Sequence, residues 1–274
     1  ARVGDWPMYV MPPGTIGGGF GDLTAARKSQ DLARLTGLFA SQAQNGHWQW
    51  YAEQHGKSAA PKRHDWIEFV RGAAPHVAAI EPTQLPTTRR FTGIGQVVMN
   101  TSLLSAQDNV EVIFKSSALG SQSHGYESQN SFLLYAFGER LLIRTGKRDQ
   151  YGSDHHRNWM WSTRSTNSIT LDGRIGQFPR SQRAIGSIES FATSAQCDWL
   201  EGEAAAAYGG KLETFRRGIL FVKPHAVIVF DRIRSKKPAT FDFWLHAQES
   251  FAIEGQHAEL RVRKAACSID WLTP

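Results

Sequence analysis

The chain has little cysteine and no long apolar run, and both shortages exclude whole classes of protein. Cys197 and Cys267 are its only cysteines among 274 residues, too few for a disulfide-rich scaffold or a zinc cluster. One disulfide between them and two buried free thiols both remain open. A helix that crosses a membrane needs about 18 or more consecutive apolar residues, and the sequence has no such run. We therefore expect no membrane span.

The charge balance is basic, but no strongly basic block is present. Lys and Arg exceed Asp and Glu by six charges, and the pI is about 9.4. A basic surface favours polyanionic partners, which include nucleic acid, anionic membranes and acidic polysaccharides. No zinc-finger spacing or other nucleic-acid motif is present, so we expect no nucleic-acid partner. Nine Trp, 15 Phe and 6 Tyr suit a large β core, and some of them also suit a cleft where rings stack on sugars.

The pattern of apolar residues changes along the chain. A Gly- and Pro-rich loop over residues 11–22 precedes a helical pattern over residues 23–42, and two further short helices are expected near residues 48–51 and 66–70. After residue 85, β-branched and aromatic runs alternate with turn signals. We predict strands at residues 95–103, 109–116, 131–137, 140–145, 167–172, 213–222, 226–234, 240–247 and 259–263.

Many strands joined by short turns indicate a large antiparallel β-sandwich. The predicted fold is therefore mainly β with an N-terminal helical segment, divided as residues 1–84 (helical) and residues 85–274 (sandwich). The helices are too few to close a helical domain, and the chain ends soon after a strand. We expect a fragment of a longer protein.

Residues 114–177 carry most of the chemistry-bearing side chains. Three motifs follow one another here: G-S-Q-S-H with Q-N-S-F (residues 120–132), Y-G-S-D-H-H-R-N-W (residues 151–159) and N-S-I-T-L-D-G-R-I-G-Q (residues 167–177). Small and polar residues between strands are typical of a site mounted on a rigid sheet.

In their order, these motifs resemble the heparinase II/III-like family of polysaccharide lyases. The segments at residues 12–22 and 85–100 are also similar to that family. The resemblance implies an N-terminal (α/α) toroid followed by a β-sandwich, with the helical segment here as the end of the toroid. It also implies β-elimination on a uronate-containing polysaccharide. The toroid usually supplies a Tyr and an Asn or His, and the sandwich supplies a His, which is His124 in this chain.

In β-elimination, positive or hydrogen-bonding groups neutralise the uronate carboxylate and stabilise the enolate-like intermediate. A base takes the C5 proton and an acid protonates the departing O4. We expect His124 to hold or polarise the uronate, with satisfaction of loop backbone groups as its alternative role. Tyr126 and Tyr151 are candidate proton donors, with packing as the alternative. The substrate-binding candidates are Gln129, Asn130, Arg144, Lys147, Arg148, His155, Arg157 and Trp159.

The chain departs from the family at the positions where relatives bind a structural metal ion. The second His of the S-H-x-H motif is replaced by Tyr126, an Asp in the following strand by Arg144, and a His before N-x-I by Thr166. Tyr, Arg and Thr do not make a zinc site. We therefore predict no metal and no cofactor, with the charge of Arg144 replacing that of the metal.

Basic residues gather beside the same motifs. Residues 140–183 hold nine Lys or Arg and three Asp, an excess equal to the net charge of the whole chain. Lys147 and Arg148 stand where relatives often carry aromatic residues; the change weakens the assignment of activity, yet Arg suits bidentate contact with carboxylate or sulfate. A solvated sheet face is the alternative interpretation of the cluster.

Two local patterns predict side-chain directions. In an extended backbone, His155 and His156 would point to opposite faces, so we expect one to face the cleft and the other to be structural. Trp159 and Trp161 would share one face, for sugar stacking or for core packing.

We interpret the chain as the sandwich part of a lyase for an acidic polysaccharide, such as alginate, a glycosaminoglycan or a similar uronate polymer. The alternative is a non-catalytic module that binds such a polysaccharide or serves a structural role. We expect a secreted or periplasmic protein; no signal peptide opens the chain, and a mature or truncated secreted protein would look the same.

Overall fold

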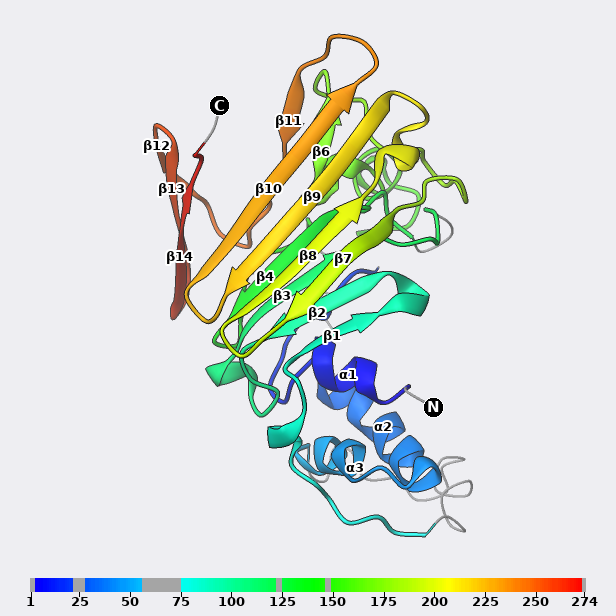
Figure 1. The fold of residues 1–274 in the computed structure, drawn as a ribbon, viewed down its shortest axis with the longest axis vertical. Helices are drawn as coiled ribbons and strands as arrows, with labels where there is room; N and C mark the ends of the chain where they lie inside the picture. The colour runs from blue at the N-terminus through cyan, green and yellow to red at the C-terminus, as the bar shows by residue number, and fades with distance from the viewer. Residues whose placement is uncertain (1–2, 22–27, 56–74, 122–124, 146–148, 273–274) are drawn as a thin grey trace.

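The computed structural model describes residues 3–21, 28–55, 75–121, 125–145 and 149–272. Two antiparallel sheets face each other, with helices at one side (Figure 1). The first sheet has the order β1-β2-β3-β4-β5 and the second has the order β10-β9-β8-β7. The predicted fold class, mainly β with an antiparallel sandwich and few helices, is confirmed.

The five-stranded sheet consists of β1 (Thr88–Phe91), β2 (Gln96–Asn100), β3 (Val110–Lys115), β4 (Ser131–Ala136) and β5 (Glu139–Leu142). The four-stranded sheet consists of β7 (Ser187–Thr193), β8 (Cys197–Glu203), β9 (Leu212–Val222) and β10 (Ala226–Ser235). Two small sheets complete the β structure. One pairs β6 (Ile169–Leu171) with β11 (Phe241–Phe243), and the other joins β12 (Ala252–Glu254), β13 (His257–Val262) and β14 (Ala265–Asp270).

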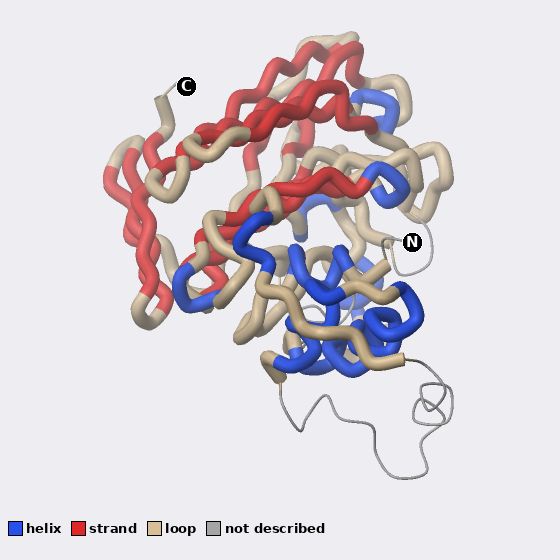
Figure 2. The backbone as a smooth tube through the Cα atoms, turned by 60° about the horizontal axis from the view of Figure 1, so that its bottom comes forward, coloured by secondary structure: helices blue, strands red, loops and turns tan. Residues whose placement is uncertain are grey.

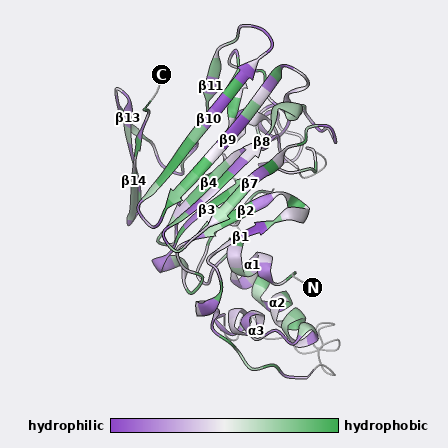
Figure 3. Ribbon diagram, viewed as in Figure 1, coloured by the Kyte–Doolittle hydropathy of each residue, from purple (hydrophilic) through white to green (hydrophobic). Residues whose placement is uncertain are grey.

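The main core fills the space between the two large sheets. Val112 and Phe114 of β3 meet Ile219 and Phe221 of β9, and all four are fully buried. Leu260 of β13 belongs to the same cluster, so the three-stranded sheet covers one end of the sandwich. Figure 3 shows hydrophobic residues over the lower parts of β9 and β10 and hydrophilic ones toward their upper ends.

The other face of the five-stranded sheet packs against the N-terminal helices α1 (Asp5–Val10), α2 (Gln30–Ala43) and α3 (Gly46–Glu53). Ile113 and Leu133 lie in one cluster with Tyr9 and Tyr51. Figure 2 shows these helices on one side of the strand layers. Because both faces of β3 are covered, its residues read as a nearly continuous buried run rather than an alternating one.

Local sequence explains the helix ends. The Asn45 side chain accepts hydrogen bonds from the backbone N–H groups of His47 and Trp48, and so caps the start of α3. Gln44 adopts a left-handed conformation with φ 50° at the end of α2. The predicted helices near residues 23–42 and 48–51 correspond to α2 and α3, whereas the one near residues 66–70 lies outside the described residues.

Each predicted strand overlaps an observed one. The strands that the sequence pattern missed are β1, β7, β8, β12 and β14, which are short or rich in Ser, Glu and Ala. The cysteines are not bonded to each other, and the expectation of two buried thiols is wrong: Cys197 is exposed and Cys267 is partly exposed. Within the described residues, no helix has the length and apolar character that crossing a membrane would need.

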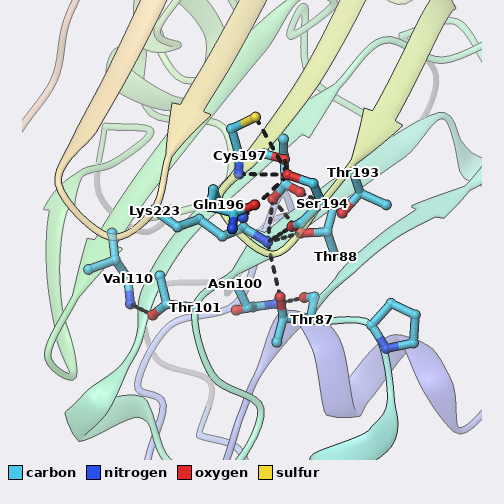
Figure 4. Close-up of polar contacts among 12 residues, drawn as sticks. Thr87, Thr88, Asn100, Thr101, Val110, Thr193, Ser194, Gln196, Cys197 and Lys223 are labelled. Carbon is cyan, nitrogen blue, oxygen red and sulfur yellow. Dashed lines mark hydrogen bonds and ion pairs between the residues drawn. The ribbon is translucent and has the colours of Figure 1, made fainter.

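A polar cluster fastens the edge strand β1 to two hairpin turns of the four-stranded sheet. Lys223 Nζ lies 2.9 Å from the carboxylate of Asp198, and both side chains are almost fully buried. Lys223 also donates to Thr87 Oγ1 and to the carbonyl of Ser194, as Figure 4 shows. Thr88 donates its hydroxyl to Asp198. The two sheets are therefore joined by paired charges as well as by the apolar core.

Glu111 is an isolated acid on the helical side of β3. Its side chain is 3% exposed, and Oε1 has no hydrogen-bond partner among the described residues. Burial raises the pKa of Glu111 well above its ordinary 4.5. The folded chain therefore keeps a proton that the unfolded chain releases above pH 4.5.

This proton linkage predicts a pH-dependent effect of Glu111→Gln. Stability of the wild type should fall as pH rises from 4.5 toward the raised folded pKa, by at most about 1.4 kcal/mol per pH unit. The variant lacks this loss, so thermal unfolding should show the two proteins nearly equal at pH 4 and the variant more stable at pH 8. Glu254→Gln, at an exposed position of β12, is the control and should match the wild type at both pH values. A pH-independent difference for Glu111→Gln would contradict the prediction.

Candidate functional site

The loops that follow β3 and β5 meet at one end of the five-stranded sheet. The backbone N–H of Glu127 donates to the carbonyl of Trp161 at 3.1 Å, and that of Thr145 donates to Ser165 at 3.0 Å. The N–H of Gln129 donates to the side chain of Gln177 at 2.9 Å. The first and third motifs are thus bonded directly to each other, and the first is bonded to Trp161, two residues after the second motif.

A row of aromatic and cationic side chains runs through these loops. The guanidinium carbon of Arg144 lies 3.8 Å from the ring centroid of Tyr126, whose ring stacks on Trp161 at 4.9 Å and 19°. His156 meets Trp161 edge-on at 5.5 Å, and Tyr151 lies 4.8 Å from His156. The structure therefore brings together three of the predicted residues: Tyr126, Arg144 and Tyr151.

Arg144 also connects the sandwich to the N-terminal segment. Its Nη2 donates to the carbonyl of Gly21 at 2.8 Å, and the residue is 4% exposed. A permanent positive charge is therefore held at the junction between the Gly-rich loop and the sheet.

The two candidate proton donors differ in accessibility. Tyr126 is 2% exposed and lies between Arg144 and Trp161, whereas Tyr151 is 77% exposed. Only Tyr151 presents its ring to solvent, at the outer end of the row.

His155 and His156 lie on a helical turn, α5 (Asp154–Asn158), not on extended backbone. The premise that they point to opposite faces of a strand is therefore wrong. The Ser153 hydroxyl accepts from the N–H of His156 and starts the turn. His155 and Arg157 are exposed, while His156 is 3% exposed.

Trp159 and Trp161 do not share a face, because the helical turn continues into this segment. The N–H groups of Trp159 and Met160 both donate to the carbonyl of His155. Trp161 joins the row with Tyr126, while Trp159 packs edge-on against Trp244 and His246 at 6.2 Å each. Desolvation lowers the pKa of His246, partly offset by its hydrogen bond with the carbonyl of Arg164.

The amides of Gln129 and Asn130 hold backbone together inside the protein. Gln129 is 2% exposed, and its Nε2 donates to the carbonyls of Ser117, Leu119 and Ala184. Asn130 is fully buried and adopts φ 52°. Its Nδ2 donates to the carbonyls of Gly202 on β8 and Phe215 on β9. Both predicted binding residues therefore lie away from solvent.

Two cations with a structural or binding role, Arg217 and Lys115, were not among the residues predicted from the sequence. Arg217 is 0% exposed; it forms a bidentate pair with Asp231 at 2.7 and 2.6 Å and donates to the carbonyls of Asn130 and Asn167. Its position in the strand could have revealed it. At two-residue spacing, Arg217 lies on the same inner face of β9 as Phe215, Ile219 and Phe221. The second cation is Lys115, whose Nζ donates to Ser128 Oγ at 3.0 Å. Burial lowers the pKa of Lys115 to about 8.

The positions that the resemblance aligns with metal ligands do not fit a metal ion here. Arg144 covers the ring of Tyr126, and the hydroxyl of Thr166 donates to the carbonyl of Thr163 at 2.8 Å. No group of three His, Cys, Asp or Glu suited to a metal ion occurs in the part of the chain that the structure describes. His124, Lys147 and Arg148 lie outside the described residues, so their predicted roles stay predictions.

Comparison with known families matches residues 83–272 to the model described as "Heparinase II/III-like, C-terminal". The chain belongs to the heparinase II/III-like family. No curated protein matches it in sequence. The resemblance seen in the motifs is thereby confirmed for most of the chain.

Solved structures support the same fold for this heparinase II/III-like chain. It superposes on the heparan sulfate lyase HepC from Pedobacter heparinus with a TM-score of 0.70 and 15% identity, covering 93% of this chain and 36% of that one. The heparinase III-BT4657 gene product gives 0.70 and 13%, covering 92% and 35%. A structure of heparinase III gives 0.69 and 14%, covering 96% and 39%. The chain therefore spans little more than a third of these relatives.

The enclosure of Arg217 generates a stability prediction for this heparinase II/III-like chain. Arg217→Met leaves Asp231 and two carbonyls without their donor, so unfolding by denaturant should show a loss of about 3–5 kcal/mol. Arg234→Met is the matched control, because Arg234 pairs with Glu213 on the same two strands but is 76% exposed; it should lose about 1 kcal/mol or less. Equal losses in the two variants would contradict the structural role of Arg217.

Proposed function

We propose that the chain is the C-terminal part of a polysaccharide lyase that cleaves a uronate-containing acidic polysaccharide by β-elimination. The observation that carries the proposal is the cationic and aromatic row at the loop junction, on a fold and in a family shared with heparinases. A glycosaminoglycan of the heparan sulfate type is the first substrate to test, because the similar structures include a heparan sulfate lyase. Alginate and other uronate polymers are the next.

β-Elimination requires positive charge near the uronate carboxylate, and it requires groups that take the C5 proton and protonate O4. Arg144, Arg157 and Arg164 supply permanent charge around the loops. Tyr151 is the accessible tyrosine, and we assign the proton transfer to it rather than to buried Tyr126. His124 is assigned to hold or polarise the uronate, and His155, Lys147 and Arg148 are proposed to contact the substrate. Because a long polysaccharide is met outside the cell, we place the protein in the secreted or periplasmic fraction.

The direct test uses the full-length protein that contains this chain. Incubation with heparan sulfate, chondroitin, alginate or glucuronan should produce new ultraviolet absorbance, because β-elimination leaves an unsaturated uronate at the new end. Neutral polysaccharide is the control and should give none. Binding to an acidic polymer without any absorbance would instead identify a non-catalytic binding module.

The role of His124 is tested separately. His124→Ala should lower turnover by at least about tenfold, which corresponds to about 1.4 kcal/mol of transition-state stabilisation. His225→Ala, at an exposed position in the turn between β9 and β10, should leave turnover unchanged. If both variants turn over like the wild type, His124 has no part in the mechanism.

A further inference from the structure

We propose that Lys115 is an anion-binding residue of this site, and that its ammonium group binds an acidic group of the saccharide. This inference rests on the proposed function, since it specifies how the same site recognises its substrate. The acidic group is a uronate carboxylate or a sulfate ester, which offer the same anionic oxygens. Lys115 was not among the residues that the motifs singled out.

The strand places Lys115 at the junction between the sheet and the N-terminal segment. It is the last residue of β3, where side chains alternate between the two faces of the sheet. Val112 and Phe114 point into the main core, and Ile113 points toward the N-terminal helices. Lys115 therefore shares the face of Ile113, and it remains partly exposed.

The partners of Lys115 in the described residues carry no negative charge. Its Nζ donates to the hydroxyl of Ser128 at 3.0 Å and lies 5.9 Å from the ring centroid of Phe20. A hydroxyl and an aromatic ring orient an ammonium group without neutralising it. The remaining hydrogen-bonding capacity of the ammonium is thus available to a ligand.

The nearest acids along the chain are committed elsewhere. Glu127, next to Ser128, accepts from the N–H and hydroxyl of Thr163 at 2.9 Å each. Glu111 lies on the same face of β3 but four residues away, a separation of about 13 Å along a strand. Neither carboxylate neutralises Lys115.

A cation in these surroundings is stabilised by an incoming anion. Burial lowers the pKa of Lys115 to about 8, in line with an ammonium that is partly desolvated and has no carboxylate partner among the described residues. Below that pH the side chain is largely charged. A carboxylate or sulfate that reaches Nζ supplies the missing partner through a charge-assisted hydrogen bond.

Arg144 supports the assignment, because it meets the same two loops. Lys115 contacts Phe20 and Ser128, while Arg144 contacts Gly21 and Tyr126. Two cations, one at the end of β3 and one in the loop after β5, thus lie along the junction of the Gly-rich loop and the site loop. Arg144 is 4% exposed, whereas Lys115 is partly exposed, so Lys115 is the more accessible of the two cations to a saccharide.

The experiment measures saccharide binding by the full-length protein with calorimetry. The probes are heparosan oligosaccharides, which carry carboxylates only, heparan sulfate oligosaccharides, which also carry sulfate esters, and neutral chitin oligosaccharides. Lys115→Gln should weaken binding of the acidic probes by about tenfold or more, the loss expected for one charged hydrogen bond. Lys115→Arg should retain binding to within about threefold. Lys237→Gln, an exposed residue in the turn after β10, makes the same change in net charge and should leave binding unaltered.

The outcomes separate this inference from the proposed function. Weakening on heparosan assigns a carboxylate to Lys115, and weakening on heparan sulfate alone assigns a sulfate ester. Acidic-probe binding that is the same in Lys115→Gln and the wild type overturns the inference, even if the wild type cleaves the polymer. Binding that depends on Lys115 without any cleavage supports the inference and overturns the lyase proposal.

A second measurement covers the case in which Lys115→Gln does not fold. The side-chain resonance of Lys115, assigned by its loss in Lys115→Arg, should shift when heparosan oligosaccharide is added and should not shift with the neutral probe. An unmoved resonance under saturating heparosan and heparan sulfate overturns the inference.

Discussion

The enclosure of one guanidinium, that of Arg217, is the constraint on which the site depends. A cation with no exposed surface is tolerated only when its charge and its donors are all satisfied. Asp231 on the neighbouring strand satisfies the charge, and the carbonyls of Asn130 and Asn167 accept hydrogen bonds from Nη1. Those carbonyls belong to the segments that lead into β4 and β6. The four-stranded sheet therefore sets the position of the loops that leave the five-stranded sheet.

This arrangement explains why so many polar residues of the motifs are buried. The side-chain amides of Gln129, Asn130 and Gln177 donate hydrogen bonds to backbone carbonyls. A loop that is buried in the protein needs such partners for its N–H and carbonyl groups. The exposed side chains of the motifs include those of Tyr151, His155 and Arg157. The motif residues thus divide into buried ones that shape the loops and exposed ones that can meet a saccharide.

The sequence was sufficient for the sandwich, because alternation and turn signals are local. It was insufficient for β7 and β8, where Ser190, Glu201 and Glu203 interrupt the apolar pattern. It also did not predict the helical turn α5 at His155, which is only five residues long. Motif resemblance pointed to loops that the structure brings together, yet it could not separate a buried Gln129 from an exposed Arg157, since that depends on contacts with distant strands. Lys115 could not be predicted as a site residue, because a lysine at the end of a strand is common. Its contacts with Phe20 and Ser128 depend on the fold.

Cations in this protein fall into two groups according to their partners. Arg217, Lys223 and Arg216 each lie against a carboxylate, and their charges are used in joining strands. Lys115 lies instead against a hydroxyl and a ring, in surroundings that lower its pKa, and it forms no ion pair with the residues that the structure describes. A half-buried charge that does not stabilise the fold by pairing is a candidate for ligand binding. By this criterion the junction between the Gly-rich loop and the sheet, rather than the exposed arginines alone, is the place that we propose for contact with an acidic saccharide.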